Sequence, residues 1–551
     1  MTSRLSSFAP QAIPAMLLPV FVFLAGGLAS AASVGNPSAP QGGEFKINIS
    51  LEPETLNPIT STDGYAREVQ GFIMDSLMER NSETYEWSPA LAEKFEISKD
   101  GKQFTFVLRK GAKWSDGKPV TVEDVKFSFD VIFDPTYNVA QLRPYYENIE
   151  KLEIVDASTV RFTTKTKYFD NFTVAAGLTV FPKHIYGNAA EGRKMNKTII
   201  GSGPYKMEKY DKGQSIVLVR NKDWWGNGVE AMKGRWNFEK IRMRFLKDSN
   251  IAIEAVKKGD IDFHDLTAEE FTKKTSGPEW GKSVMKVQTQ NIAPKLYGYI
   301  GWNFKRPMFA NKDVRLALYK LINREEMNQK FRYGLATYAT GPWSPQSEYA
   351  DSSVKPVLYD PKGAVELLKK AGYSDSDKDG LLDHVVNGRK ENLSFTLYYG
   401  SKDNEKYYVL YQSDLRKVGI EMKLQLLEWN AILKNVDEKN FDAIAMSWGG
   451  GSVDLDPKQI WYSTSANKGG SNFISYANPE VDKMIDEARM ELDKQKRIPL
   501  LRAVYRKIAD DVPYAFMFTD KFVMYAHSTK IAMLKPTYKY EIGTGYWWIT
   551  K

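Results

Sequence analysis

The residues best suited to chemistry lie in an acidic loop, Asp375-Ser-Asp-Lys-Asp-Gly-Leu-Leu-Asp383. Acidic side chains at its first, third, fifth and ninth positions, with glycine at the sixth, match the ligand pattern of a calcium-binding loop. The twelfth position is Val386, so the bidentate glutamate of such loops is missing. The pattern therefore leaves two interpretations open, an acidic surface turn and a structural calcium site formed by Asp375, Asp377, Asp379 and Asp383.

Residue patterns for catalysis fit the chain poorly. The histidines, His184, His264, His384 and His527, lack the HExxH spacing of a catalytic zinc site. The cluster Gly201–Tyr205 lacks the spacing of a G-x-S-x-G nucleophile elbow, and a chain with no cysteine has no thiol nucleophile. A carboxylate pair for glycoside hydrolysis meets only in three dimensions, so the sequence does not exclude one. We expect a protein that is not an enzyme and that needs no cofactor, apart from calcium if the acidic loop binds it.

The N-terminus has the pattern of a secretory signal peptide over residues 1–31. A single charge, Arg4, precedes the apolar stretch Met16–Leu28, and Ala29–Ala31 supplies small residues for cleavage. Residues 32–43 are rich in Gly, Pro and Ser and predict a flexible linker. Because the chain has no cysteine, it cannot be a lipoprotein. A large, exported, cysteine-free protein fits the bacterial periplasm.

The elements that must position any site alternate between strand and helix in two regions. In the first, Ile241–Phe245 predicts a strand, Asn250–Lys258 a helix and Ile261–Phe263 a strand. In the second, the predicted elements are the strand Leu393–Tyr399, the helix Tyr407–Val418, the strand Ile420–Leu427, the helix Asn430–Val436 and the strand Phe441–Met446. The two regions favour two separate α/β lobes with a ligand cleft between them.

Between these regions and the N-terminus, a shorter stretch is also easy to interpret. Phe104, Phe106 and Leu108 alternate as one face of a half-buried strand. Thr121 followed by Asp124 resembles a capping box and predicts that a helix begins there.

Composition limits the function classes. A chain of 551 residues exceeds the ~250–300 residues at which a single core stops growing, so several domains are expected. The formal net charge is +8, but Lys and Arg are interleaved with Asp and Glu along the chain, which argues against nucleic-acid binding. Aromatic residues make up 13% of the chain, enough for large cores or for an aromatic-lined cleft.

A series of short motifs, in a fixed order, resembles the family 5 extracellular solute-binding proteins, the peptide/nickel-type receptors of bacterial ABC importers. The resemblance runs from about Leu56 to Tyr538. The motifs are Leu56-Asn-Pro58, Leu91-Ala-Glu93, Trp114-Ser-Asp-Gly117, Asp124-Val125, Phe127-Ser-Phe129, Gly201-Ser-Gly-Pro-Tyr205, Trp302-Asn303, Asp313-Val-Arg315, Ala317, Trp448, Asp454, Asp456-Pro457, Trp461, Tyr476, Asn478-Pro479, Val481-Asp482 and Pro513.

The resemblance implies a type II periplasmic-binding fold, an α/β architecture of two main lobes joined by a hinge. It also implies an extra domain inserted in the first lobe. We expect lobe I to comprise residues 44–80, 197–300 and 518–551, domain II residues 81–196, and lobe III residues 301–517. The resemblance further implies a monomer that docks on permease subunits in the inner membrane.

Within this family, an aspartate shortly after a conserved tryptophan pairs with the α-ammonium of a bound peptide. Here Trp448 is followed by three glycines, and the next acids are Asp454 and Asp456. The resemblance points to Asp454 as the ammonium partner and to Asp456 as a turn residue. We therefore expect Asp454→Ala to weaken the binding of free-amino peptides more than the binding of N-acetylated ones. The other predicted ligand-binding residues are Tyr65, Tyr297, Trp302, Asn303, Trp429, Trp448, Gly449, Gly450 and Phe516.

The predicted function is capture of a di- to oligopeptide in the cleft between the lobes and its delivery to a permease. The same receptor class also serves other cargoes, so a nickel chelate, haem, an opine or a sugar is the alternative. A hydrolase and a folding helper or signalling receptor are the remaining alternatives. The sequence leaves the identity and length of the ligand open.

Overall fold

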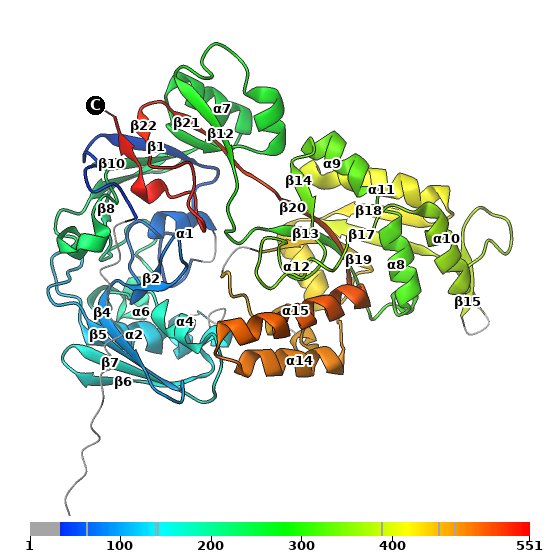
Figure 1. Cartoon of the computed structure of the whole chain (residues 1–551), viewed down its shortest axis with the longest axis horizontal. Coiled ribbons are helices and arrows are strands. Elements are labelled where there is room, and N and C mark those ends of the chain that lie inside the picture. The colour runs from blue at the N-terminus through cyan, green and yellow to red at the C-terminus, as the bar shows by residue number, and fades with distance from the viewer. Residues whose placement is uncertain are drawn as a thin grey trace, which may run out of the picture.

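A computed structural model describes residues 34–61, 64–137, 139, 143–386, 389–449, 452–467 and 470–550. Three larger sheets, each with its own hydrophobic core, organise the chain. Figure 1 shows the N-terminal and C-terminal segments together in one body, the green-to-orange part of the chain in a second, and a smaller β-rich domain beneath the first. Residues 1–31, with the predicted signal peptide, lie outside the described residues. Among the described residues, no helix has the length and apolar character needed to cross a membrane.

Lobe I is built on a seven-stranded mixed sheet. The strand β1 is parallel to both of its neighbours, β10 and β11, and the helix that follows β10 carries the chain across β1 to β11. In spatial order the strands are β12 (Val284–Thr289), β21 (Val523–Ser528), β11 (Phe263–Asp265), β1 (Glu44–Ile49), β10 (Lys240–Phe245), β9 (Ser215–Arg220) and β8 (Tyr205–Asp211). The helices α1 (Gly64–Gln70) and α7 (Ser249–Lys258) belong to the same lobe.

Domain II is a four-stranded antiparallel sheet covered by α2 (Val122–Phe133). The predicted half-buried strand is confirmed, since Phe104, Phe106 and Leu108 are all buried on one face. The predicted capping box is confirmed as well, since the Thr121 amide donates to Asp124 at 2.8 Å at the start of α2. The strands are β4 (Ala92–Ile97), β5 (Gln103–Leu108), β7 (Thr159–Thr164) and β6 (Ile149–Asp156). A hairpin, β2 (Met78–Arg80) and β3 (Trp87–Pro89), and α4 (Asn171–Ala176) complete the part of this domain used below.

Lobe III contains a six-stranded sheet inside the largest core of the protein. Its strands, in spatial order, are β14 (Ala336–Tyr338), β20 (Tyr514–Asp520), β13 (Tyr297–Trp302), β19 (Ala443–Trp448), β17 (Ser394–Tyr399) and β18 (Glu421–Leu426). Its main helices are α8 (Lys312–Lys320), α9 (Arg324–Arg332), α10 (Pro361–Lys370), α11 (Glu405–Lys417), α12 (Trp429–Asp437), α14 (Pro479–Met490) and α15 (Lys494–Asp511). Both predicted strand–helix–strand regions are present, although β11 begins only at Phe263, the last residue of the strand predicted at Ile261–Phe263. In the second region, β17 lies between its parallel partners β18 and β19.

The hinge is formed by two chain crossings between the lobes. Residues 290–296 join β12 to β13, and residues 521–522 join β20 to β21. The predicted domain boundaries, at 300/301 and 517/518, therefore cut through β13 and β20, which both belong to the sheet of lobe III. The difference arises because a strand ends where its pairing with the neighbouring strand ends, and the sequence alone does not show that position.

The predicted linker differs from what the structure shows. The Gly42 amide donates to the Asn237 carbonyl at 2.8 Å. A side chain at Gly35 would lie 2.3 Å from the carbonyl oxygen of Gly234. Residues 35–42 thus pack against lobe I, because glycine permits a close backbone contact. Composition alone had suggested that this segment is flexible.

Candidate functional site

A small pocket of about 40 Å³ lies beside the first hinge crossing. We call it the hinge pocket. Ligand sites typically occupy ~300–1,000 Å³, so this conformation leaves only a small remnant of such a space. Its lining residues come from the hinge, from the loop that follows β14 and from the loop that follows β19, and they are Ile292, Ala293, Pro294, Lys295, Tyr297, Pro342, Trp343, Ser344, Ser347, Gly449, Ser452, Val453 and Leu455.

A second hollow, of about 430 Å³, lies on lobe III alone, beside the start of α9. It is lined by Arg324, whose guanidinium already donates to the carbonyl oxygens of Phe516 and Val357 at 2.7 and 2.6 Å. Its main polar group is therefore engaged in holding lobe III together. The hinge pocket is the better candidate, because it touches the part of the chain that connects the lobes.

Two polar side chains in the hinge pocket lack partners. Tyr297 is 2% exposed, and its hydroxyl has no hydrogen-bond partner among the residues that the structure describes. The Lys295 ammonium is buried and is likewise unpaired within the described chain. Burial lowers the pKa of Lys295, an effect that the charge of Asp520 partly offsets. Burial also raises the pKa of the Tyr297 phenol well above its ordinary value.

The segment 452–456 forms one wall of the hinge pocket and also touches the opposite side of the cleft. Val453 and Leu455 line the pocket. The residues that alternate with them, Asp454 and Asp456, interact with side chains on the other side. The Val453 amide donates to the hydroxyl of Tyr85 at 3.1 Å, which ties the segment to the hairpin β2–β3.

Asp454, the predicted ammonium partner, is already surrounded by polar groups. Its carboxylate accepts a hydrogen bond from the hydroxyl of Tyr349 at 2.6 Å. The guanidinium of Arg80, on β2, and the ammonium of Lys494, on α15, each lie 3.9 Å from it. With two cations beside it, Asp454 acts in this conformation as a bridge across the cleft. Its predicted contact with a ligand ammonium stays a prediction.

Asp456 makes a second bridge. Its carboxylate accepts from the hydroxyl of Tyr168, in domain II, at 2.7 Å and from Arg489, on α14, at 2.9 Å. It also caps the amide of Lys458 at 3.0 Å, which agrees with a role in a turn. The Phe169 amide donates to the Arg489 carbonyl at 3.0 Å, and Figure 1 shows α14 and α15 beside α4 of domain II. The lobes are therefore in contact along this edge.

Trp448 lies between two aromatic rings rather than alone in the cleft. It stacks on Tyr299 and Phe473, with ring centroids 6.2 and 5.3 Å away. Gly449 has φ of 138°, and a side chain there would lie 2.6 Å from the Lys295 carbonyl oxygen. This glycine thus permits close contact with the hinge, whereas the sequence suggested close contact with the ligand. Gly450 lies outside the described residues.

Three predicted ligand residues are placed inside lobe III. Trp302 is fully buried beside Phe309. The Asn303 amide donates to the carbonyls of Lys439 and Phe441 at 3.0 and 2.8 Å, and Phe516 is 2% exposed. This is a correction to their predicted position, because side chains enclosed by their own core do not reach a ligand in the cleft.

The remaining two predicted residues are accessible. Trp429 is 55% exposed at the start of α12. Tyr65 is half-buried on α1, where its ring packs against the core of lobe I. Neither lines the hinge pocket, and their ligand contacts stay predictions.

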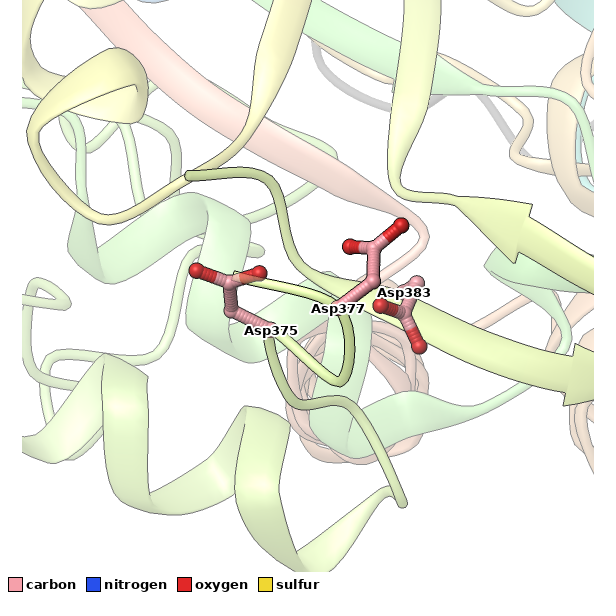
Figure 2. Close-up of side chains that lie close together, drawn as sticks. All are labelled: Asp375, Asp377 and Asp383. Atoms are coloured by element: carbon pink, nitrogen blue, oxygen red, sulfur yellow. The ribbon is translucent and has the colours of Figure 1, made fainter. Parts of the chain in front are cut away.

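The acidic loop lies far along lobe III, on the turn before β15 (Asp383–Val386). Figure 2 shows Asp375 and Asp377 on the loop and Asp383 at the strand that follows; their carboxylate oxygens lie within 4.8 Å of one another. The ammonium of Lys390 contacts Asp377 and lies 3.8 Å from Asp379 and 3.7 Å from Asp383. A protein cation therefore occupies the position that calcium would take, and calcium binding stays a prediction.

Sequence reasoning missed Lys295, Arg80, Tyr349 and Lys494. Arg80, Tyr349 and Lys494 reach Asp454 only because distant segments come together in the fold, and no local sequence pattern indicates such a contact. Lys295 had one usable signal, since it stands in the short stretch between two predicted lobes. A lone lysine in a hinge is a weak signal until its surroundings show that it is buried.

The chain is similar to known proteins along nearly its whole length. The model of the bacterial extracellular solute-binding proteins, family 5 Middle, matches residues 86–470. The oligopeptide-binding protein AppA of Bacillus subtilis is 30% identical, with 91% of each chain covered. The probable peptide-binding protein YejA of Agrobacterium fabrum is 26% identical, with 94% of this chain and 91% of the relative covered.

Solved structures give the same result for the fold. The structure of AppA from Bacillus subtilis in complex with a nonapeptide has a TM-score of 0.75 at 29% identity and covers 93% of this chain and 100% of its own. The binding protein DppA from Helicobacter pylori in complex with the peptide STSA has a TM-score of 0.77, covers 93% of this chain and 99% of its own, and is 24% identical. The predicted two-lobed α/β fold is thereby confirmed.

Proposed function

Because the chain belongs to family 5 of the bacterial extracellular solute-binding proteins, we propose that it binds a peptide between its lobes and delivers it unchanged to an ABC importer. The observation that carries this proposal is the 30% identity with an oligopeptide-binding protein over 91% of both chains. Likeness over the whole length includes both lobes and the hinge, and these are the parts that capture requires.

The arrangement of the cleft supports capture by closure. The segment 452–456 joins lobe III to Tyr85, Arg80 and Tyr168 on the opposite side, and its other face forms a wall of the hinge pocket. A ligand in the pocket thus adjoins the contacts that hold the closed state. Binding energy then appears as a shift in population from open to closed.

Export and transport complete the proposal. A signal peptide over residues 1–31 is removed, and the mature protein acts as a monomer in the periplasm. Permease subunits in the inner membrane recognise the closed form. The protein performs no chemistry on its ligand.

The most direct experiment is native mass spectrometry of the protein purified without refolding. We expect co-purified peptides, which leave on denaturation and return when di- to nonapeptides are added. A nickel chelate, haem, an opine or a sugar in their place would contradict the peptide proposal. New peptide termini after incubation would indicate a hydrolase, and unimpaired growth on peptides after gene deletion would argue against transport.

A further inference from the structure

We propose that Asp170 couples closure of the lobes to the uptake of one proton, so that the closed form becomes more populated as the pH falls. The inference goes beyond the proposed function, because it concerns the equilibrium between open and closed states with or without a ligand. The observation behind it is the position of Asp170, which caps the start of α4 in domain II at the edge where lobe III makes contact.

Asp170 directly follows two residues that bind lobe III. The Tyr168 hydroxyl donates to the carboxylate of Asp456 at 2.7 Å. The Phe169 amide donates to the Arg489 carbonyl at 3.0 Å. When these bonds form, the carboxyl group of Asp170 is brought against lobe III, and when the lobes separate it returns to water.

The carboxyl group of Asp170 is poorly compensated in this position. Its Oδ1 is enclosed and has no hydrogen-bond partner among the residues that the structure describes. The cation that acts on it, Arg80, is shared, since its guanidinium donates to the Thr173 hydroxyl at 3.2 Å and lies 3.9 Å from Asp454. A charged carboxylate is costly to bury in this way, whereas a neutral carboxyl group costs much less.

Titratable and charged side chains from every element packed around Asp170 form one cluster. They are Arg80 on β2, Tyr168 before α4, Tyr349 in the loop after β14, Asp454 and Asp456 in the segment 452–456, Arg489 on α14, and Lys494 and Arg497 on α15. Three aspartates therefore meet where domain II touches lobe III. Burial raises the pKa of Asp170 from 3.8 to about 7, and the two lobe III aspartates add to this rise against the opposing effects of Thr173 and Arg80.

The lobe III cations of this cluster have other partners. Arg489 donates to the carboxylate of Asp456 at 2.9 Å. The Lys494 ammonium lies 2.6 Å from the Glu348 carboxylate. Arg497 donates to two backbone carbonyls at 2.9 and 3.2 Å. Their charge is therefore already engaged when closure brings a third aspartate into the cluster.

The direction of the pH effect follows from the two states of Asp170. In the open form its carboxyl group meets water, so its pKa returns toward the ordinary 3.8. The closed form then binds a proton that the open form has released, which favours closure as the pH falls. With these two pKa values, the ratio of closed to open protein should be about tenfold higher at pH 6 than at pH 8.

The test measures the binding of tetra-alanine by calorimetry at pH 6 and pH 8, in the wild type and in Asp170→Asn. The variant keeps the shape of the side chain but takes up no proton. The ratio of its affinity to that of the wild type should therefore be about tenfold higher at pH 8 than at pH 6. Comparing the two proteins cancels the titration of the peptide's own amino group. A ratio that does not change with pH would overturn the inference.

Asp130→Asn is the matched control in the same domain, because its carboxylate on α2 is 50% exposed. It should keep the pH dependence of the wild type. Glu68 on α1 is a rival source of the proton, since burial and the charge of Asp265 raise its pKa to about 7. A pH dependence that Glu68→Gln abolishes and Asp170→Asn retains would overturn the assignment to Asp170.

Failure of the proposed function is recognised separately. If tetra-alanine does not bind the wild type, the peptide proposal loses its support, and X-ray scattering of the ligand-free protein decides on the proton. The radius of gyration of the wild type should then be larger at pH 8 than at pH 6, and Asp170→Asn should show no such change. The same measurement on the wild type alone serves if the variant does not fold. Equal radii at both pH values would overturn the inference.

Discussion

The polar groups on the two sides of the segment 452–456 differ in whether they have partners. On the face toward the other side of the cleft, the carboxylates of Asp454 and Asp456 are paired with tyrosine hydroxyls and with cations. On the face toward the pocket, the ammonium of Lys295 and the hydroxyl of Tyr297 have no partner in the described chain. Paired groups join the two sides of the cleft, whereas the unpaired ammonium and hydroxyl are enclosed beside the hinge at a cost in stability.

The largest expected effect comes from Asp454→Ala, which leaves Arg80 and Tyr349 without their shared acceptor. We expect the free energy of unfolding, measured by denaturant titration, to fall by about 2 kcal/mol. In calorimetry, loss of the bridge should weaken the binding of free-amino and N-acetylated peptides alike, and the predicted contact with the ligand ammonium should make the loss larger for free-amino peptides. Equal losses for both would leave Asp454 as a bridge alone and remove it from the role of ammonium partner. Asp510→Ala, at a carboxylate that is 70% exposed, is the control with little effect.

The pH dependence of stability tests the paired face through Asp170. Burial, with Asp456 and Asp454 nearby, raises the pKa of Asp170 from 3.8 to about 7, although Thr173 and Arg80 oppose this. The folded protein therefore holds a proton that the unfolded chain releases near pH 3.8. The stability from that proton is complete below pH 3.8 and is lost as pH rises through about 7.

We accordingly expect Asp170→Asn to melt at a higher temperature than the wild type at pH 8, by about 2 °C or more, with a smaller difference at pH 5. The measurement is thermal unfolding of ligand-free protein at both values. A difference that does not change with pH would mean that Asp170 titrates normally and does not belong to the buried contact.

A smaller effect is expected from Tyr168→Phe, which removes one hydrogen bond between domain II and Asp456. The closed state should lose about 1 kcal/mol, visible as an increase in radius of gyration by X-ray scattering and as about fivefold weaker ligand binding. Tyr145→Phe is the matched control, since its bond to Gln459 is exposed and 3.4 Å long. Equal effects of both changes would show that the hydrogen bond from Tyr168 to Asp456 does not stabilise the closed state.

The smallest effect is expected at the acidic loop, which extends the comparison to a third region. Because the ammonium of Lys390 already lies beside three of its four carboxylates, calcium in place of a chelator should change the melting temperature of the wild type by less than about 1 °C. Lys390→Gln should respond to calcium, whereas Lys369→Gln, at an exposed lysine on α10, should not. A strong response of the wild type would show that calcium displaces Lys390 and would establish the structural site.

Local patterns predicted the elements well, because their causes are local. The alternation of Phe104, Phe106 and Leu108 and the capping box at Thr121 depend on neighbours a few residues away. The site was harder to predict, because its geometry depends on segments up to several hundred residues apart, such as Arg80 and Asp454. Aromatic residues such as Trp302 were assigned to a ligand although they fill a core, since the same side chain serves both purposes.

The alternating faces of the segment 452–456 also constrain how such a receptor diverges. A substitution at Val453 or Leu455 that reshapes the pocket moves the backbone that carries Asp454 and Asp456. A change of ligand in this lineage therefore alters the equilibrium between the open and closed states. Selection must adjust ligand specificity and this equilibrium together. Laboratory evolution toward a new cargo should accordingly gather compensating substitutions on the hairpin β2–β3 and on α14, far from the guest itself.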